Sequence, residues 1–242
     1  MLLEARSVTQ MFGSFRAVSD ADLEVREGDI IGLIGPNGAG KSTFFNCLSG
    51  DLVPTVGSIR FDGEDMTRAS PETHARLGIG RTFQIPATFP EMTILDNVMV
   101  GAFLRHAHRS DAREAALETI EFVGLQSVSH QRARGLGTPG RKRLEIARVL
   151  ATGPRLMLLD EALAGLNPGE IQTAIELVRR IHQRGITLVI TEHIMEVILS
   201  LTHRVLVFNQ GRTIASGSPK DVVNDPQVIE AYIGRPRRRR VS

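Results

Sequence analysis

The 242-residue sequence predicts an α/β fold with a mainly parallel sheet. First, short runs rich in β-branched and aliphatic residues alternate with segments of helical periodicity. Second, the apolar run at 30–34 is followed by a glycine-rich turn and then by a helical segment. Third, 42% hydrophobic and 23% charged residues are typical of a folded chain of one large or two small domains, which excludes general disorder.

The expected elements follow in order along the chain. The predicted strands are 30–34, 58–61, 80–83, 156–160, 187–191 and 204–208, with a hairpin return at 211–215. A helix is expected from Lys41 to Gly50. Between 93 and 152 we find helical stretches at about 94–104, 112–123 and 141–151 and no convincing strand, which predicts a helical insertion in the α/β core.

The basic charge of the sequence is confined to its end. Lys and Arg number 29 against 27 Asp and Glu, but removing the five arginines within 235–240 leaves 24 − 27 = −3. This excludes a basic nucleic-acid binder and leaves a tail that either meets acidic lipid or an acidic partner or is a solvated end. One cysteine, Cys47, fits a reducing compartment and a core position. With no long apolar run and no signal-like start, we expect a cytoplasmic protein.

The first chemical motif, GPNGAGKST, lies between a predicted strand and a predicted helix. Its glycines let successive backbone N–H groups surround a phosphate, and the helix directs its positive dipole end at the same anion. Lys41 would contact the β and γ phosphates, Ser42 would bind Mg²⁺, and Thr43 would reach the α phosphate. An accidental glycine turn is the alternative, which the flanking strand and helix disfavour. The motif comprises Gly35, Pro36, Asn37, Gly38, Ala39, Gly40, Lys41, Ser42 and Thr43.

The second motif, LMLLDE at 156–161, is an apolar strand that ends in two carboxylates. Asp160 at the strand end would hold the water shell of Mg²⁺, and Glu161 would polarise an attacking water as general base. The alternative is a strand followed by a solvated helix cap.

With these motifs the sequence resembles the ATP-binding cassette (ABC) family over nearly the whole chain. The resemblance implies a P-loop NTPase core with a mainly parallel sheet, an N-terminal antiparallel β part and an inserted helical subdomain, with ATP and Mg²⁺ as cofactors. It implies a single domain over 1–242, divided into a core of 1–85 and 153–234, a helical subdomain of 86–152 and a basic tail of 235–242.

The resemblance also implies roles for further residues. Gln84, in RTFQ, resembles the glutamine that reaches Mg²⁺ and the attacking water. His193, in TEHIME, resembles the histidine that contacts the γ phosphate and positions Glu161, although a lone histidine is more often packing or surface. Phe12, in MFG, matches the aromatic that stacks on adenine, with Phe15 the second candidate and core packing the alternative. The loop 164–167 matches the one that crosses to a partner subunit.

The chain departs from the family at the signature motif, a Leu-Ser-Gly-Gly-Gln-like helix start that contacts ATP on the opposite subunit. RLEIARVL at 143–150 fixes the register, which leaves no hydroxyl at 137, no N–H at 139 and no side-chain amide at 140. Each lost hydrogen bond to a phosphate is worth about 1.5 to 3 kcal/mol. Partial compensation would come from Thr138 as a helix cap and from the cations at 141–143, unless these form a solvated face. The altered signature reads Leu136, Gly137, Thr138, Pro139 and Gly140.

Several longer segments are similar to the ATP-binding subunits of bacterial branched-chain amino acid importers. They include ARLGIGRTFQIPATFPEMTILDNVMVG and GRTIASGSPKDVVNDPQVIEAYIG, the latter predicting a strand return and two short helices. This implies a second, different ATPase subunit in a heterodimer with unequal sites, two membrane permeases and a periplasmic solute-binding protein. The chain would then lie at the cytoplasmic face of the inner (plasma) membrane, attached through the permeases.

Two other readings remain open at this point. Related importers carry amides, urea and other small polar solutes. The signature loss also fits a degenerate nucleotide-binding partner with little or no hydrolysis. In the family, a groove near 84–97 receives a permease helix, and Phe89, Pro90, Met92 and Ile94 give that segment an apolar character which core packing explains equally well.

Overall fold

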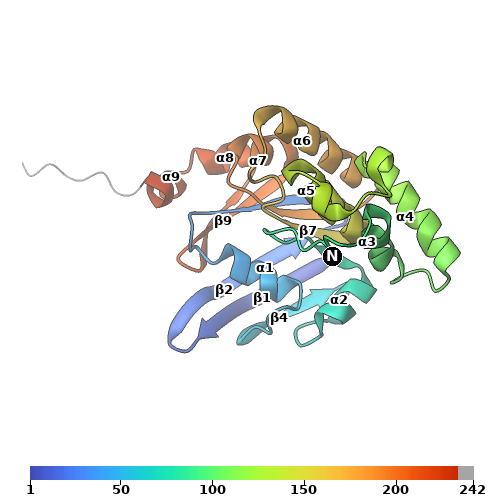
Figure 1. Ribbon diagram of the computed structural model, residues 1–242. Coiled ribbons are helices and arrows are strands. Elements are labelled where there is room, and N and C mark those ends of the chain that lie inside the picture. Colours follow the sequence, from blue (N-terminus) through green and yellow to red (C-terminus); the bar gives the residue numbers. More distant parts are fainter. Residues whose placement is uncertain (234–242) are drawn as a thin grey trace, which may run out of the picture.

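The computed structural model describes residues 1–233, which form two β-sheets with helices packed against them (Figure 1). The larger sheet has the strand order β10-β9-β3-β8-β7-β6, and all neighbours are parallel except β10 with β9. The predicted α/β class with a mainly parallel sheet is therefore confirmed. The six strands are β3 (Ile30–Ile34), β6 (Ile79–Arg81), β7 (Leu156–Asp160), β8 (Thr187–Thr191), β9 (Arg204–Asn209) and β10 (Arg212–Gly217).

A smaller antiparallel sheet has the order β2-β1-β4-β5. The predicted strand at 58–61 belongs to this sheet and not to the parallel one. The N-terminal antiparallel part that the family resemblance implies is thus present, although strand patterns alone located one strand of it. Its strands are β1 (Leu3–Phe12), β2 (Phe15–Val25), β4 (Val56–Phe61) and β5 (Glu64–Asp65).

Helix α1 (Lys41–Leu48) packs against both sheets. Its Phe44 and Phe45 are fully buried in one cluster with Leu33 of β3 and Ile59 of β4. Cys47 lies in the same cluster, as predicted, and burial raises the pKa of its thiol to about 11. The segment that precedes α1 is therefore anchored at both ends in the rigid interior.

The chain between β6 and β7 forms helices α3 (Ile94–Ala102), α4 (Arg109–Val123) and α5 (Thr138–Leu150), which gather at one side of the larger sheet (Figure 1). All three predicted helices are present. Helix α5 begins at Thr138 and not at 141, because Gly137 adopts the extended backbone of an N-cap residue and Pro139 suits a first helical turn. Two short 3₁₀ turns, Gln126–Val128 and Ala133–Gly135, connect α4 to α5.

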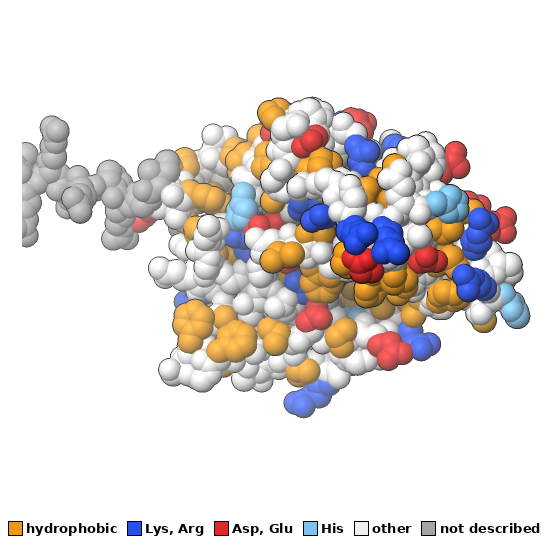
Figure 2. Space-filling model, viewed as in Figure 1, with side chains coloured by type: hydrophobic (Ala, Val, Ile, Leu, Met, Phe, Trp, Pro, Cys, Tyr) orange, Lys and Arg blue, Asp and Glu red, His pale blue; other side chains and the backbone are white. Residues whose placement is uncertain are grey.

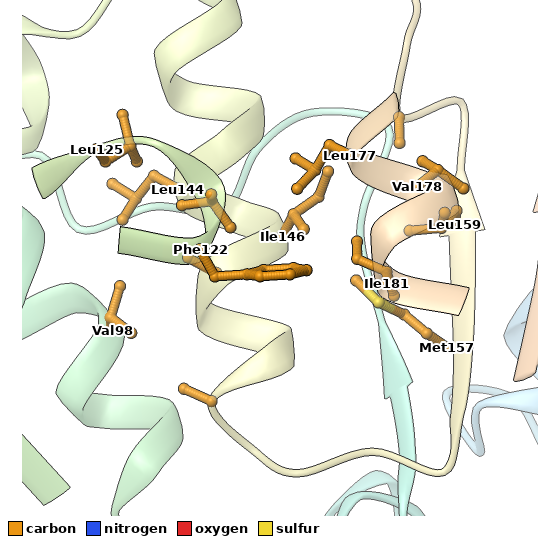
Figure 3. Close-up of a cluster of buried hydrophobic side chains, with 14 of the residues drawn as sticks. Val98, Phe122, Leu125, Leu144, Ile146, Met157, Leu159, Leu177, Val178 and Ile181 are labelled. Atoms are coloured by element: carbon orange, nitrogen blue, oxygen red, sulfur yellow. The ribbon is translucent and has the colours of Figure 1, made fainter. Parts of the chain in front are cut away.

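One continuous core joins these helices to the parallel sheet and to α6 (Pro168–Gln183). Figure 3 shows the ring of Phe122 pointing from α4 toward Ile146 of α5 and Ile181 of α6, with Met157 of β7 beside it. Truncating Phe122 to alanine would cost about 3 to 5 kcal/mol of stability, because the surrounding side chains would relax only partly into the cavity that the ring leaves.

Four further helices of the described chain adjoin the strands of the larger sheet in sequence. Helix α2 (Pro71–Leu77) precedes β6, α7 (Met195–Leu201) follows β8, and α8 (Pro219–Val223) and α9 (Pro226–Ile233) follow β10, which confirms the two short helices predicted there. The arginine tail, predicted at 235–242, lies outside the described residues. Within residues 1–233 no helix is both long enough and apolar enough to cross a membrane.

Candidate active site

The loop predicted to hold phosphate connects the end of β3 to the start of α1. Gly35 has φ +151°, and a Cβ there would lie 2.1 Å from the carbonyl oxygen of Phe208. Gly40 has φ +101°, and its Cβ would lie 2.4 Å from the carbonyl oxygen of Ala17. Any side chain at either position would displace the backbone of β9 or β2, so this cradle requires glycine at both.

Lys41 is the first residue of α1 and lies back across the loop. Its Nζ donates hydrogen bonds to the carbonyl oxygens of Gly35 (2.7 Å) and Pro36 (3.1 Å). Burial lowers the pKa of Lys41, while the carboxylates of Glu161 and Asp160 act in the opposite direction. Together the ammonium, the glycine cradle and the helix N-terminus form a positively charged concavity that fits the phosphates of a nucleotide.

A cavity of about 570 Å³ opens beside the loop. Residues 37–43 form one wall, and the side chains of Gln84, Glu161 and His193 form another. Ser42 is exposed in this cavity, where its hydroxyl is accessible to a metal ion. Polar residues that are far apart in the sequence thus meet at the phosphate loop, as predicted.

The carboxylate of Glu161 lies between an amide and an imidazole. Gln84 donates from Nε2 to Oε2 of Glu161 over 2.7 Å, and His193 Nε2 lies 2.5 Å from Oε1. The three residues follow β6, β7 and β8, which are adjacent parallel strands. Because the carboxyl ends of parallel strands lie at one edge of a sheet, the three loops converge there.

Asp160 lies at the end of β7 and is 4% exposed. Thr191 donates from Oγ1 to Oδ1 (2.7 Å), and Arg81 donates from Nη2 to Oδ2 (2.9 Å). Arg81 also donates to Asp51 over 2.9 Å. Asp160 is therefore held firmly behind the cavity and does not line it, which suits a contact with a metal ion through water.

Arg81 and Thr191 are site residues that sequence reasoning missed. A signal for Arg81 was present, since a charged residue lies within a short apolar strand directly before TFQ. Thr191 gave none, because a threonine that ends a buried strand is common in any parallel sheet.

The structure separates the two candidates for the aromatic residue. Phe15, at the start of β2, lines the cavity, whereas Phe12, at the end of β1, is not among its lining residues. Both side chains are exposed, so core packing explains neither of them. Figure 2 shows hydrophobic side chains on the face formed by β1 and β2. The geometry favours Phe15 over the predicted Phe12.

The altered signature lies at the start of α5 and does not line the cavity of this chain's own phosphate loop. The prediction that Thr138 caps the helix is wrong, because Gly137 occupies the N-cap position and no side chain caps α5. Arg141 turns back and donates from Nε to the carbonyl oxygen of Leu136 over 2.9 Å. Figure 2 shows Lys and Arg side chains gathered over this helical part of the surface.

A second cavity, of about 370 Å³, lies between the β6 region and helices α3 and α5. Phe83, Ala87, Val100 and Leu104 contribute apolar surface to it. The four apolar residues predicted for this groove are not among its lining residues: Ile94 is fully buried, and Phe89 packs under the guanidinium of Arg148. The groove is thus near the predicted segment, but different side chains line it.

Comparison with known proteins agrees with this geometry. The family model described as ABC transporter matches residues 18–164, and one described as branched-chain amino acid ATP-binding cassette transporter matches 212–237. The high-affinity branched-chain amino acid transport ATP-binding protein BraF of Pseudomonas aeruginosa is 38% identical, covering 96% of this chain and 98% of the relative. The corresponding protein LivG of Escherichia coli is 36% identical with the same two coverages.

Solved structures give the same result. A crystal structure of the ADP conformation of an ATP-binding cassette of an ABC transporter is 32% identical, with a TM-score of 0.88 over 97% of this chain and 99% of that chain. A nucleotide-free cassette is 31% identical, with a TM-score of 0.88 and the same coverages. The chain therefore belongs to the ABC transporter family as an ATP-binding cassette, with the P-loop NTPase core of an ABC-type ATPase.

Proposed function

We propose that this chain hydrolyses ATP to power a membrane importer for branched-chain or related amino acids. The observation that carries the proposal is the cavity in which the phosphate loop faces Glu161, held between Gln84 and His193. The proposed solute class is supported by the likeness to BraF and LivG over 96% of the chain and by the family match at 212–237.

Each site residue has a proposed role. The backbone of residues 35–43 and the ammonium of Lys41 bind the phosphates of ATP. Ser42 and Gln84 would hold Mg²⁺ directly and Asp160 would hold it through water, and the ion would supply positive charge opposite the phosphates of ATP. Glu161 accepts a proton from the attacking water, and His193 keeps that carboxylate in place and contacts the γ phosphate. The open cavity, the glycine-dependent cradle and the oxygen ligands suit ATP together with Mg²⁺.

The aromatic contact to adenine is assigned to Phe15, because it lines the cavity and is freely exposed. Stacking on an exposed ring favours a planar base and excludes water from one of its faces.

A second, different ATPase subunit is proposed to complete the sites. The start of α5 is exposed at Gly137 and Thr138 and does not line this chain's phosphate cavity, which suits contact with a nucleotide held by a partner. Since 137 lacks a hydroxyl and 140 lacks an amide, a partner with a complete signature would give one active site and one weaker site. In a homodimer both sites would carry the loss.

Attachment to two permeases is proposed to occur at the groove beside β6, which would place the chain at the cytoplasmic face of the inner (plasma) membrane. Val100 and Phe83 are each 44% exposed there, so apolar surface is available for a short helix of the permease. A periplasmic solute-binding protein would deliver the solute to those permeases and would not contact this chain. No nucleic-acid partner is proposed.

A degenerate partner that binds ATP without hydrolysing it is the second candidate, favoured by the glycines at 137 and 140. Reconstitution separates the two. The chain, co-purified with its membrane partners in vesicles, is supplied with Mg-ATP inside and labelled leucine, isoleucine, valine or urea outside. ATP-dependent uptake that Glu161→Gln abolishes supports the first candidate. Uptake that Glu161→Gln leaves unchanged supports the second, and uptake of urea alone corrects the solute class.

A further inference from the structure

The turn that carries Glu161 has an unusual backbone. Glu161 has φ +47°, and among the described residues it is one of five other than glycine with positive φ. Residues with a Cβ rarely adopt this conformation, and it persists only where the surrounding structure imposes it. The carboxylate that faces the phosphate loop is thus aimed by a backbone that would relax without support.

A buried lysine supports this turn from one side. Lys142 of α5 is 7% exposed, and its Nζ donates a hydrogen bond to the backbone carbonyl oxygen of Glu161 over 3.1 Å. An ammonium that is withdrawn from water needs such a partner, so the contact fixes both the side chain and the carbonyl. Lys142 follows the altered signature in the same helix, which joins the start of α5 to the catalytic turn.

A buried glutamate supports the turn from the other side. Glu192, directly after β8, is 2% exposed, and its Oε1 accepts a hydrogen bond from the backbone N–H of Leu163 over 2.7 Å. The pKa of Glu192 is raised to about 7, chiefly by burial; the hydrogen bond from Leu163 and the charge of Lys142 act against this rise, and the charge of Glu161 adds to it. A buried carboxyl group whose pKa is raised this far is a candidate for a functional role.

We infer that Lys142 and Glu192 are positioning residues that clamp the strained turn at 160–163, so that the carboxylate of Glu161 stays between Gln84 and His193. Neither of them lines the nucleotide cavity, so they act on the reaction through Glu161 and not on ATP binding. The inference rests on the proposed role of Glu161 as the base. It assigns to α5 a function in this chain's own ATP site, separate from the contact proposed between its first turn and a partner's nucleotide.

Two disruptive and two conservative substitutions test the clamp. Lys142→Met removes the donor at similar length, whereas Lys142→Arg keeps one. Glu192→Leu removes the acceptor, whereas Glu192→Gln keeps an oxygen that can accept from Leu163. The matched control is Lys220→Met, at an exposed lysine of α8.

Hydrogen–deuterium exchange of the full chain reports the turn directly, without turnover or partners. We expect amides of 161–164 to exchange about tenfold faster or more in Lys142→Met and Glu192→Leu, because their hydrogen-bonded turn opens more often. The conservative variants and the control should match the wild type. Unchanged exchange in a folded Lys142→Met or Glu192→Leu overturns the clamp, and if one variant does not fold the other decides.

Kinetics of the chain co-purified with its partners test the effect on catalysis. The disruptive variants should lose about tenfold or more in kcat, while KM for ATP and the Kd of fluorescent mant-ATP change less than about twofold. The conservative variants should recover most of kcat. Equal losses in kcat and in mant-ATP affinity would overturn the inference, since they indicate general damage. If Glu161→Gln itself kept full activity, the proposed base would fail, whereas the exchange measurement would still judge the clamp.

Discussion

The phosphate cavity and the start of α5 are equipped very differently for contact with a nucleotide. The cavity offers a glycine cradle, a lysine, an exposed serine hydroxyl and a carboxylate fixed by two neighbours. The start of α5 offers Gly137 without a hydroxyl, Pro139 without an N–H and Gly140 without an amide. In the proposed heterodimer the chain would thus contribute complete chemistry to one ATP and an incomplete contact to the other, so the two contributions can be altered separately.

The largest effect is expected from Glu161→Gln on the complete side. Removing the proposed base should lower turnover by about 10³-fold, within the range typical of general base catalysis, while ATP stays bound. Phosphate release and filter binding of labelled ATP measure the two properties. Glu118→Gln, at an exposed position of α4, is the control. A variant that still hydrolyses ATP at the wild-type rate would remove the distinction between the two regions.

The buried carboxyl of Glu192 should make the stability of the folded chain depend on pH. Because its folded pKa of about 7 exceeds the ordinary value of 4.5 for a glutamate side chain, the folded chain binds more protons than the unfolded chain between these values. The free energy of unfolding should therefore fall as pH rises through this window, by up to about 3 kcal/mol.

Glu192→Gln, which does not titrate, removes this contribution. The Tm of the variant minus that of the wild type should increase by several degrees from pH 5 to pH 8, measured by thermal unfolding. A constant Tm difference across that range would show that Glu192 is ionised in the folded chain as readily as in the unfolded one.

At the start of α5, Gly137→Ser should restore the hydroxyl for contact with the partner's ATP. A Cβ at 137 meets no atom closer than 3.9 Å, and the extended backbone there accepts serine. One hydrogen bond to a phosphate, worth about 1.5 to 3 kcal/mol, would raise the rate of hydrolysis at the weaker site of the assembled transporter about tenfold. The matched control is Gly135→Ser, where a Cβ also meets open space. If Gly137→Ser leaves this rate unchanged, the altered signature does not limit hydrolysis.

The smallest effect is expected at the edge of the cavity. Phe15→Ala should weaken binding of Mg-ATP about tenfold, because stacking on a base is worth about 1 to 3 kcal/mol. Phe12→Ala should change it less than twofold, and both side chains are exposed, so stability should hold. Isothermal titration measures both affinities. A greater loss from Phe12→Ala would return the adenine contact to that residue.

How far the sequence predicts the fold depends on how regular each element is. Strand β3 and helix α1 are predictable because an apolar run, a glycine turn and a helical pattern are adjacent in the chain. Strands β1 and β2 are long, but their pairing shifts register between Ala5 and Val8, Val8 and Gln10, and Gln10 and Met11. Such irregularities interrupt the strict alternation that identifies a strand, so strand patterns alone missed this hairpin.

The candidate site divides in the same way. Lys41, Asp160 and Glu161 belong to local motifs, so the sequence alone predicts them. Arg81, Lys142 and Glu192 do not, because their hydrogen-bond partners lie 79, 19 and 29 residues away. Only the order of strands and the packing of α5 bring those pairs together.

Cys47 has a practical consequence for following this molecule at work. It is the one cysteine of the sequence, and its buried thiol with a pKa of about 11 carries almost no thiolate at neutral pH. Alkylating probes should therefore leave the wild-type chain unlabelled. Two cysteines placed at exposed positions, one in the helical part and one in a sheet, would then be the only ones to react, so a pair of spin labels or dyes can report the distance between these parts without first replacing the native residue.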